Sequence, residues 1–373
     1  MSDAIDSKRL YAELLALTGE GSPFYFKDYG LYRVFNYRLA SYTDFLKPSA
    51  LEARGVMFYM EEGKEPVLVC RPFKKFFNRN ENPFTMNLDL TQVRKWAVKE
   101  DGSIITSYLE AGVGELKVKS KQSLYSEQTA MATTFLDRPE NADLKKDTEA
   151  VTRLGNTVIF ELVSPMNRIV IDYPKTELRV LGVRSNHMGN CYSKYLWKDS
   201  HPALYFHWVK EFGGKEINAE EVAKMTGIEG FIGIMEDGLM FKDKTDWYKA
   251  LHHLKDGVNS PRNMFNAIID EAIDDAKSMY STDASFIQRI VDMENIILPV
   301  YNNMISFVEK FYEDNKHLER KEYAINGQAE AKGLFSLVMG KYTGKGSTYQ
   351  DFAKKYHKEV FGISFAEEQP EED

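Results

Sequence analysis

The sequence predicts an α+β protein in which an antiparallel-sheet domain, residues 1–250, is followed by an all-α domain, residues 251–373. Three observations support this prediction. A chain of 373 residues is too long for one compact core and indicates more than one domain. Between about residues 52 and 248, short alternating apolar runs are separated by turn dipeptides, a pattern typical of antiparallel sheets. After about residue 250 the apolar residues recur with a helical period.

The first domain is expected to open with a helix and the aromatic stretch Tyr32–Tyr37 and then to form strands. Turns are expected at Asp101-Gly102 and at Asp237-Gly238, because these dipeptides accept the positive φ of tight hairpins. The runs that predict strands most directly are residues 55–60, 104–109, 157–163 and 168–173.

The second domain is expected to begin with a helix whose N-cap is Ser260, since Pro261 suits the first helical position. A helical stripe that Pro299 interrupts then follows. Core packing between helices accounts for this stripe. Its apolar members are Phe286, Ile290, Met293, Ile297, Met304, Phe307 and Phe311.

Composition excludes several classes of protein. The formal net charge of −8 excludes a uniformly basic nucleic-acid-binding surface but allows a local basic groove. Two cysteines without a CxxC pair exclude a disulfide framework and a cysteine-rich zinc site. The polar N-terminus does not resemble a signal peptide, and no apolar run approaches the roughly 20 residues of a membrane span. We therefore expect a soluble protein of the cytoplasm that does not bind a membrane.

The segment that suggests chemistry is Lys99-Glu-Asp-Gly102, in which a lysine lies at the end of a predicted strand beside a rigid turn. The strand would fix the stem of Lys99 while its amine reaches into a cleft. Alone this string is weak, and a surface hairpin with a solvated lysine explains it equally well.

Four further features accompany it. Strand alternation places Lys117, Lys119 and Lys121 on one face, although a lysine-protected edge strand would do the same. Glu161 lies inside an apolar strand, where a carboxylate normally needs a cation or metal partner. The third feature is a strand that begins at Glu229, followed by a return strand that carries Lys242 and Lys244. The fourth is a strand preceded by Arg54, with Lys75 nearby in the sequence.

The order of these features resembles the lysine-dependent nucleotidyltransferases, which include nucleic-acid ligases and mRNA capping enzymes. Lys99-x-Asp-Gly102 is similar to the nucleophile motif, Phe160-Glu161 to the third, Glu229-Gly230 to the fourth and Lys242-x-Lys244 to the fifth. Further strings across the chain resemble the phage RNA ligase 1 family of tRNA-repair enzymes. These are Leu51-Glu-x-Arg-Gly55, residues 75–78, residues 80–86, residues 165–170 and Asp246-Trp-Tyr248.

The resemblance implies that Lys99 attacks the α-phosphate of ATP and forms a lysyl–AMP intermediate. An ordinary lysine, with pKa near 10.4, is neutral in only about 0.04% of molecules at pH 7, and nearby cations and burial favour the neutral form. Lys242 and Lys244 would contact the α-phosphate, and Arg54 and Lys75 the ribose or phosphates.

The remaining roles follow from the same resemblance. Glu161 would bind the ribose and a Mg²⁺ ion with its water shell, with Mn²⁺ as a possible substitute. Glu229 would lie near the adenosine. Tyr37, Lys119 and Lys121 would complete the ATP-binding residues.

Asp274 and Asp275 are candidate metal ligands by the same resemblance, although a solvated helix face explains them equally well. Tyr248 matches a position implicated in activity, and a core aromatic is an equal alternative. The implied partners are RNA, as a tRNA nicked in its anticodon loop, and an end-healing kinase and phosphatase. A bacteriophage enzyme would act in the cytoplasm of its bacterial host.

Two alternatives remain. A DNA ligase or capping enzyme usually carries a β-rich OB-fold after the fifth motif, whereas the pattern here is helical. A non-catalytic tRNA-binding protein could retain the fold, although the intact charged set argues against it. The string Gly340–Thr348 imitates a phosphate-binding loop but has the wrong spacing between its glycines.

Overall fold

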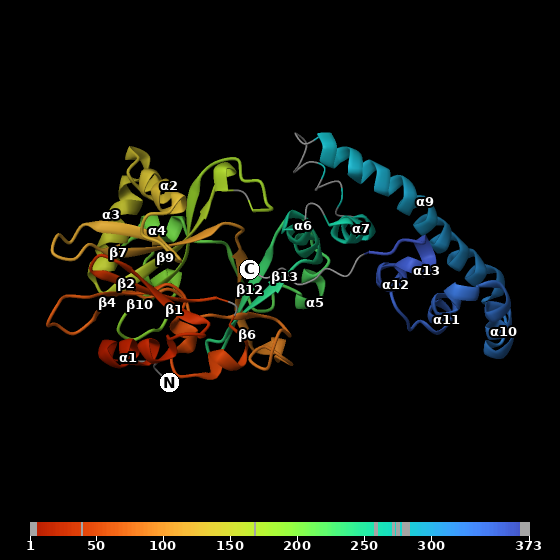
Figure 1. The fold of residues 1–373 in the computed structure, drawn as a ribbon, viewed down its shortest axis with the longest axis horizontal. Coiled ribbons are helices and arrows are strands. Elements are labelled where there is room, and N and C mark those ends of the chain that lie inside the picture. The colour runs from red at the N-terminus through yellow and green to blue at the C-terminus, as the bar shows by residue number, and fades with distance from the viewer. Residues whose placement is uncertain are drawn as a thin grey trace. The chain divides into compact units, whose positions relative to one another are not determined.

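The computed structural model describes residues 6–38, 40–167, 169–256, 260–270, 273, 277 and 284–365 (Figure 1). The chain divides into two compact units, Met1–Thr245 and Asp246–Asp373. Antiparallel sheets occupy the first unit and helices the second, so the predicted α+β class is confirmed. Among the described helices, none combines the length and the apolar character that crossing a membrane requires.

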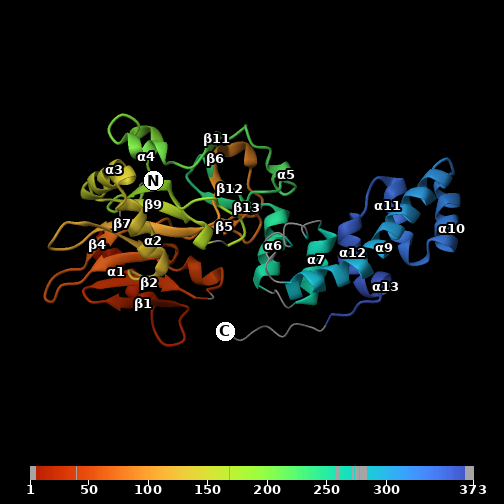
Figure 2. The ribbon, with the colours of Figure 1, turned by 90° about the horizontal axis from the view of Figure 1, so that it is seen from above.

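The first unit contains three sheets (Figure 2). The first sheet has the order β1-β2-β3-β4, with β1 Phe24–Tyr29, β2 Tyr32–Tyr37, β3 Val56–Tyr59 and β4 Val67–Cys70. The second has the order β10-β9-β7-β8, with β7 Ser103–Leu109, β8 Leu116–Ser120, β9 Asn156–Val163 and β10 Glu177–Ser185. The third has the order β11-β6-β12-β13-β5, with β5 Phe77–Asn78, β6 Val93–Lys99, β11 Glu211–Gly213, β12 Gly230–Met235 and β13 Met240–Lys244.

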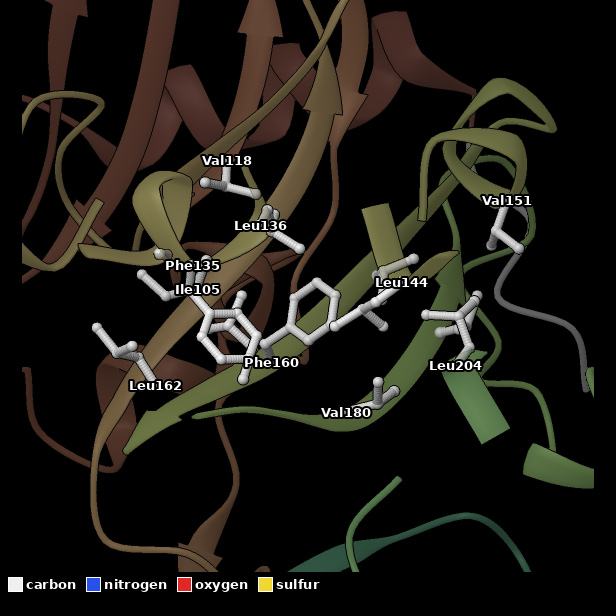
Figure 3. Packing of buried hydrophobic residues seen from close by; sticks show 14 of the residues in the cluster. Ile105, Val118, Phe135, Leu136, Leu144, Val151, Phe160, Leu162, Val180 and Leu204 are labelled. Atoms are coloured by element: carbon white, nitrogen blue, oxygen red, sulfur yellow. The ribbon is translucent and has the colours of Figure 1, made fainter. Parts of the chain in front are cut away.

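Helices and a neighbouring sheet cover the two faces of the second sheet. On one face, side chains from α2 and α3 pack against the strands, including Phe135, Leu144 and Phe160 (Figure 3). On the other face, Met57 and Cys70 of the first sheet pack against Tyr108. The helices of the first unit are α1 Ser7–Leu17, α2 Glu127–Leu136, α3 Ala142–Arg153, α4 Pro202–Phe206 and α5 Ala219–Val222.

The second unit is built around the long helix α9, Ala284–Asn315. Its neighbours along the chain include α7, which begins at Pro261 with the predicted N-cap Ser260 accepting from the backbone N–H of Asn263. With α7 Pro261–Ile269, the helices whose bounds the structure describes in this unit include α6 Asp246–Asp256, α10 Arg320–Glu330, α11 Phe335–Thr343, α12 Tyr349–Lys355 and α13 His357–Phe361.

The structure corrects the sequence prediction for Pro299, which does not interrupt the helix because α9 runs through it. An interior proline costs a helix roughly 3 kcal/mol. Ile297, Tyr301 and Met304 are buried on both sides of the proline, and their packing offsets this cost.

Residues 101–102 do not form the predicted tight hairpin. β6 pairs with β11 and β12, whereas β7 pairs with β8 and β9, so the chain crosses from one sheet to another at this turn. Gly102 is outside the positive-φ region. The matching prediction at Asp237-Gly238 is confirmed, because Gly238 has φ +89° between the paired strands β12 and β13.

The predicted strand 168–173 is also wrong in the part that the structure describes, residues 169–173. Val170 and Ile171 donate their backbone N–H groups to the carboxylate of Asp101, each at 2.7 Å. These donors are therefore used by a side chain and not by a strand ladder.

Candidate active site

Three neighbouring strands of the third sheet place charged side chains at one end. Lys99 on β6 and Lys244 on β13 both lie opposite Gly230 on β12. Glu229 precedes this glycine and is buried, with its Oε2 2.6 Å from Lys99 Nζ and its Oε1 3.0 Å from Lys244 Nζ. A Cβ atom at Gly230 would lie 2.1 Å from the carbonyl oxygen of Asp243, so this close approach requires a glycine after Glu229.

The turn after Lys99 is held by hydrogen bonds to a distant loop. Besides its two backbone donors at residues 170–171, Asp101 donates its own N–H to the hydroxyl of Tyr173 at 2.9 Å. Glu100 accepts from the same hydroxyl at 3.0 Å and pairs with Arg179 at 2.6 Å. The residues that follow the predicted nucleophile are thus fixed from both sides.

Gly102 brings this turn close to β9. A Cβ atom there would lie 2.2 Å from the carbonyl oxygen of Leu162, which no side chain could tolerate without a backbone shift. The backbone N–H of Gly102 donates to Glu161 Oε1 at 3.1 Å. The glycine therefore couples the position of Lys99 to that of Glu161.

Lys99 faces a cavity of about 530 Å³, which we call the first cavity. Most of the charged residues predicted from sequence line it: Arg54, Lys99, Lys121, Glu161, Lys242 and Lys244. Burial and the nearby cations, Lys75 and Arg54 foremost, lower the pKa of Lys242 to about 7. Such a concentration of positive charge favours a polyanionic ligand.

The carboxyl of Glu161 titrates in an unusual range for an acid. Burial raises its pKa to about 7. The positive charge of Lys99 opposes this rise, and the negative charge of Glu229 adds to it. A bound cation would favour its charged form. Among the described residues there is no group of three or more histidine, cysteine or acidic side chains that could hold a metal ion.

Arg54 presents an unsatisfied donor. Its Nη1 atom is buried without a hydrogen-bond partner among the described residues. Burial lowers the pKa of the guanidinium, although Tyr37 and Glu161 act in the opposite direction. Because buried donors are almost always paired, this atom fits an anionic ligand in the first cavity.

Lys75 and Lys121 both lie near Tyr37, each with its Nζ 5.7 Å from the centre of the Tyr37 ring. Lys121 lines the first cavity, and burial followed by the nearby Arg54 lowers its pKa. Lys75 instead lines a second cavity of about 970 Å³. The two cavities share Phe73, Phe76, Leu181, Ile234 and Met240.

Within the first unit, Lys119 and Lys117 are not brought into this group. Lys119 is fully buried, lines neither cavity, and donates from Nζ to the carbonyl oxygen of Ser120 at 3.1 Å. Lys117 is partly exposed and pairs with Glu115. Tyr248 belongs to the second unit, where it is buried with its ring 5.7 Å from that of His252. Asp274 and Asp275 lie outside the described residues.

Sequence reasoning missed the buried charges that support the Arg54 loop. Glu52 Oε1 lies 2.8 Å from Arg71 Nη2 and 2.7 Å from Arg184 Nη2, and all three side chains are buried. The guanidiniums lower the pKa of Glu52 to about 2 against the effect of burial. The available signal was the position of Glu52 two residues before Arg54, inside a string already singled out for its family resemblance.

Comparisons with known proteins identify RNA ligases as similar along most of the chain. Residues 52–248 match a family described as RNA ligase, and residues 255–364 match one described as T4 RNA ligase 1, C-terminal domain. A protein of Thermovibrio ammonificans, described as a candidate RNA ligase, is 26% identical over 330 residues, which cover 84% of this chain and 83% of that protein.

Two solved structures are also similar. One form of an archaeal ATP-dependent RNA ligase matches with a TM-score of 0.43 and 15% identity, over 97% of both chains. A variant of the Naegleria gruberi RNA ligase matches with a TM-score of 0.38 and 15% identity over 51% of this chain. The chain spans about three fifths of the length of that ligase, 60%.

Proposed function

The chain belongs to the phage RNA ligase 1 family, with its nucleotidyltransferase fold, and on that premise we propose that it joins RNA ends at the expense of ATP. One observation supports the proposal above all. Lys99 and Lys244 share the buried carboxylate of Glu229 at the wall of a cavity that also presents Arg54 and Lys242.

In the first step, Lys99 Nζ attacks the α-phosphorus of ATP. A nitrogen–phosphorus bond forms, the bond from the α-phosphorus to the bridging oxygen breaks, and pyrophosphate leaves with that electron pair. The amine must lose its proton before it attacks. The cations of the first cavity bind the triphosphate and offset the charge that develops during transfer. Lys242 and Lys244 act on the α-phosphate, and Arg54 supplies its buried Nη1 donor.

The residues present fit a magnesium ion that keeps most of its water. Within the described part of the chain, only one oxygen of Glu161 accepts a hydrogen bond, and a cation would stabilise the charged form of this carboxylate. Magnesium is usually bound by one or two carboxylates together with substrate phosphates and several waters. Such an ion would neutralise phosphate charge during transfer, and Mn²⁺ could take its place.

The two later steps use RNA. AMP passes from Lys99 to a 5′-phosphate, and the 3′-hydroxyl of the second end then displaces AMP to form a phosphodiester. We propose a tRNA nicked in its anticodon loop as the physiological substrate, recognised by the helical unit. A kinase and a phosphatase would first supply a 5′-phosphate and a 3′-hydroxyl where cleavage leaves other termini.

A sealing assay tests this function. The wild-type protein with ATP and Mg²⁺ should join a 5′-phosphorylated single-stranded RNA, and the Lys99→Ala variant should not. The variant should still seal an RNA that carries a chemically attached 5′-adenylyl group, because that substrate bypasses the lysine.

The proposed substrate is tested separately. Full-length protein should seal an anticodon-nicked tRNA faster than an unstructured RNA with the same ends. Equal rates would remove the tRNA from the proposal but leave the ligase activity. A protein that seals no RNA and only binds tRNA would refute the catalytic function.

A further inference from the structure

A group of aromatic and basic side chains, of which Tyr195, Lys198 and Phe206 are exposed, lies next to the two cavities and takes no part in the proposed nucleotide chemistry. We call it the aromatic patch, and it consists of Lys194, Tyr195, Lys198, Tyr205 and Phe206. It lies on the 3₁₀ turn Lys194–Leu196, on α4 and, at Lys198, on the segment between them; α4 packs beside α3 (Figure 2). Phe206 is 79% exposed and Tyr195 66% exposed, so folding of the chain does not explain these rings.

The rings of the aromatic patch are close enough to act as one platform. The ring centres of Tyr195 and Tyr205 are 6.1 Å apart, and those of Tyr205 and Phe206 are 5.9 Å apart. Lys194 Nζ lies 5.4 Å from the centre of the Tyr195 ring, and Lys198 Nζ lies 5.9 Å from that of Tyr205. Lys198 makes no ion pair within the described ranges, so its charge is available to a ligand.

Glu211 links the aromatic patch to the first cavity, which it lines. Its Oε1 accepts from Trp208 Nε1 at 3.2 Å, and Trp208 lines the second cavity. Its Oε2 lies 3.6 Å from Nζ of Lys194, whose amine is over the Tyr195 ring. The patch is thus one side chain removed from the cavity that Lys99 faces.

The second cavity continues this path. Its wall includes Tyr192 and Trp208, which flank the aromatic patch in sequence, and also the cations Lys75 and Arg94. Arg94 is exposed. Exposed aromatic rings beside cations suit unpaired bases, because every base can stack on a ring while lysines and arginines contact the phosphates.

We propose that the aromatic patch and the second cavity bind a single-stranded segment of RNA next to the end that reacts at Lys99. This inference rests on the proposed ligase function and adds where the RNA lies and how it is held. Bases stack on Tyr195 and Phe206, and Lys198 contacts the backbone. The binding does not depend on base identity, because stacking is tolerant of sequence.

The experiment measures binding of a fluorescein-labelled, 5′-phosphorylated single-stranded RNA to full-length protein by anisotropy, without ATP so that no chemistry occurs. Phe206→Ala and Tyr195→Ala should each raise the Kd at least about fivefold, as loss of one base stack does. Leu154→Ala removes an equally exposed apolar side chain of the same unit and should leave the Kd unchanged.

The charge contribution has its own control. Lys198→Ala should reduce the slope of log K against log salt by about 0.7, the value for one phosphate contact on a single strand. Lys224→Ala, at a lysine whose side chain is 73% exposed, should leave the slope unchanged. A duplex RNA of equal length should show a smaller effect of Phe206→Ala, since its bases are already stacked.

Unchanged RNA affinity in Tyr195→Ala and Phe206→Ala would overturn the inference, as would an equal loss for the duplex. All patch variants should still acquire AMP from labelled ATP as the wild type does, because that step needs no RNA. If the wild type acquires no AMP, the proposed function fails, whereas the measured Kd values still decide whether the patch binds RNA.

Discussion

Removing the charge of Glu52 should destabilise the first unit and loosen the loop that carries Arg54. Besides its contacts at Oε1, Glu52 Oε2 accepts from Arg184 Nη1 at 2.8 Å. Arg71 and Arg184 are 1% and 2% exposed, so neither guanidinium could turn to water if the carboxylate were lost. The variant Glu52→Gln keeps the size of the side chain and removes only its charge.

The magnitude follows from the titration of Glu52. Its pKa is lowered from 4.5 to about 2, and one unit corresponds to about 1.4 kcal/mol, so the charged form contributes about 3 kcal/mol to folding. Breaking a buried ion pair from one side costs roughly 3–5 kcal/mol in other proteins, which agrees. Because the folded-state pKa is lowered, this stability is present above about pH 4.5 and is lost as the pH falls through 2.

Urea unfolding followed by tryptophan fluorescence measures the effect, since Trp96 is buried in the first unit. At pH 7 the free energy of unfolding of Glu52→Gln should be about 3 kcal/mol below that of the wild type, and the difference should narrow below about pH 4.5. Glu115→Gln, which affects an exposed pair with Lys117, should cost less than about 1 kcal/mol. If Glu52→Gln unfolds within about 0.5 kcal/mol of the wild type, the buried cluster is not what holds this loop.

Three further predictions concern the first cavity. The ATP affinity of a Lys99→Ala protein should fall by up to about tenfold per pH unit above the pKa of Lys242, which is about 7 in the wild type and rises when the charge of Lys99 is removed, because a bound triphosphate favours the protonated form of Lys242. Lys242→Arg should flatten this pH profile in calorimetric titrations. Gly102→Ala should lower AMP labelling by at least about tenfold, because the added Cβ would meet the Leu162 carbonyl oxygen. Gly19→Ala should leave labelling unchanged, because the space around Gly19 is open. Equal labelling of the two variants would contradict the close-approach argument. Lys121→Ala should weaken ATP binding and Lys117→Ala should not, since only Lys121 lines the cavity; equal losses would indicate a broad charge effect.

Sequence periodicity predicted where many strands lie but not how they pair. Asp101-Gly102 and Asp237-Gly238 carry the same turn signal, yet only the second joins paired strands. The difference arises because β6 finds its partners, β11 and β12, more than 100 residues away. A local dipeptide contains no information about such distant pairing.

The candidate site was predicted through motif order, and the structure adds the geometry that motifs lack. Alternation placed Lys117 and Lys119 on one face of a strand, but it could not show that the first sheet covers that face at Lys119. Composition rules also place most acids and arginines at the surface. The buried cluster of Glu52 with Arg71 and Arg184 is an exception that only its three-dimensional neighbours explain.

The most direct test of the central claim, that Lys99 is the nucleophile, is to map the residue that becomes attached to AMP. The protein is incubated with ATP and Mg²⁺, digested and examined by mass spectrometry. We expect a single AMP adduct on Lys99 and its absence from the Lys99→Ala variant. An adduct on Lys242, Lys244 or Lys121, or undiminished labelling of Lys99→Ala, would contradict it.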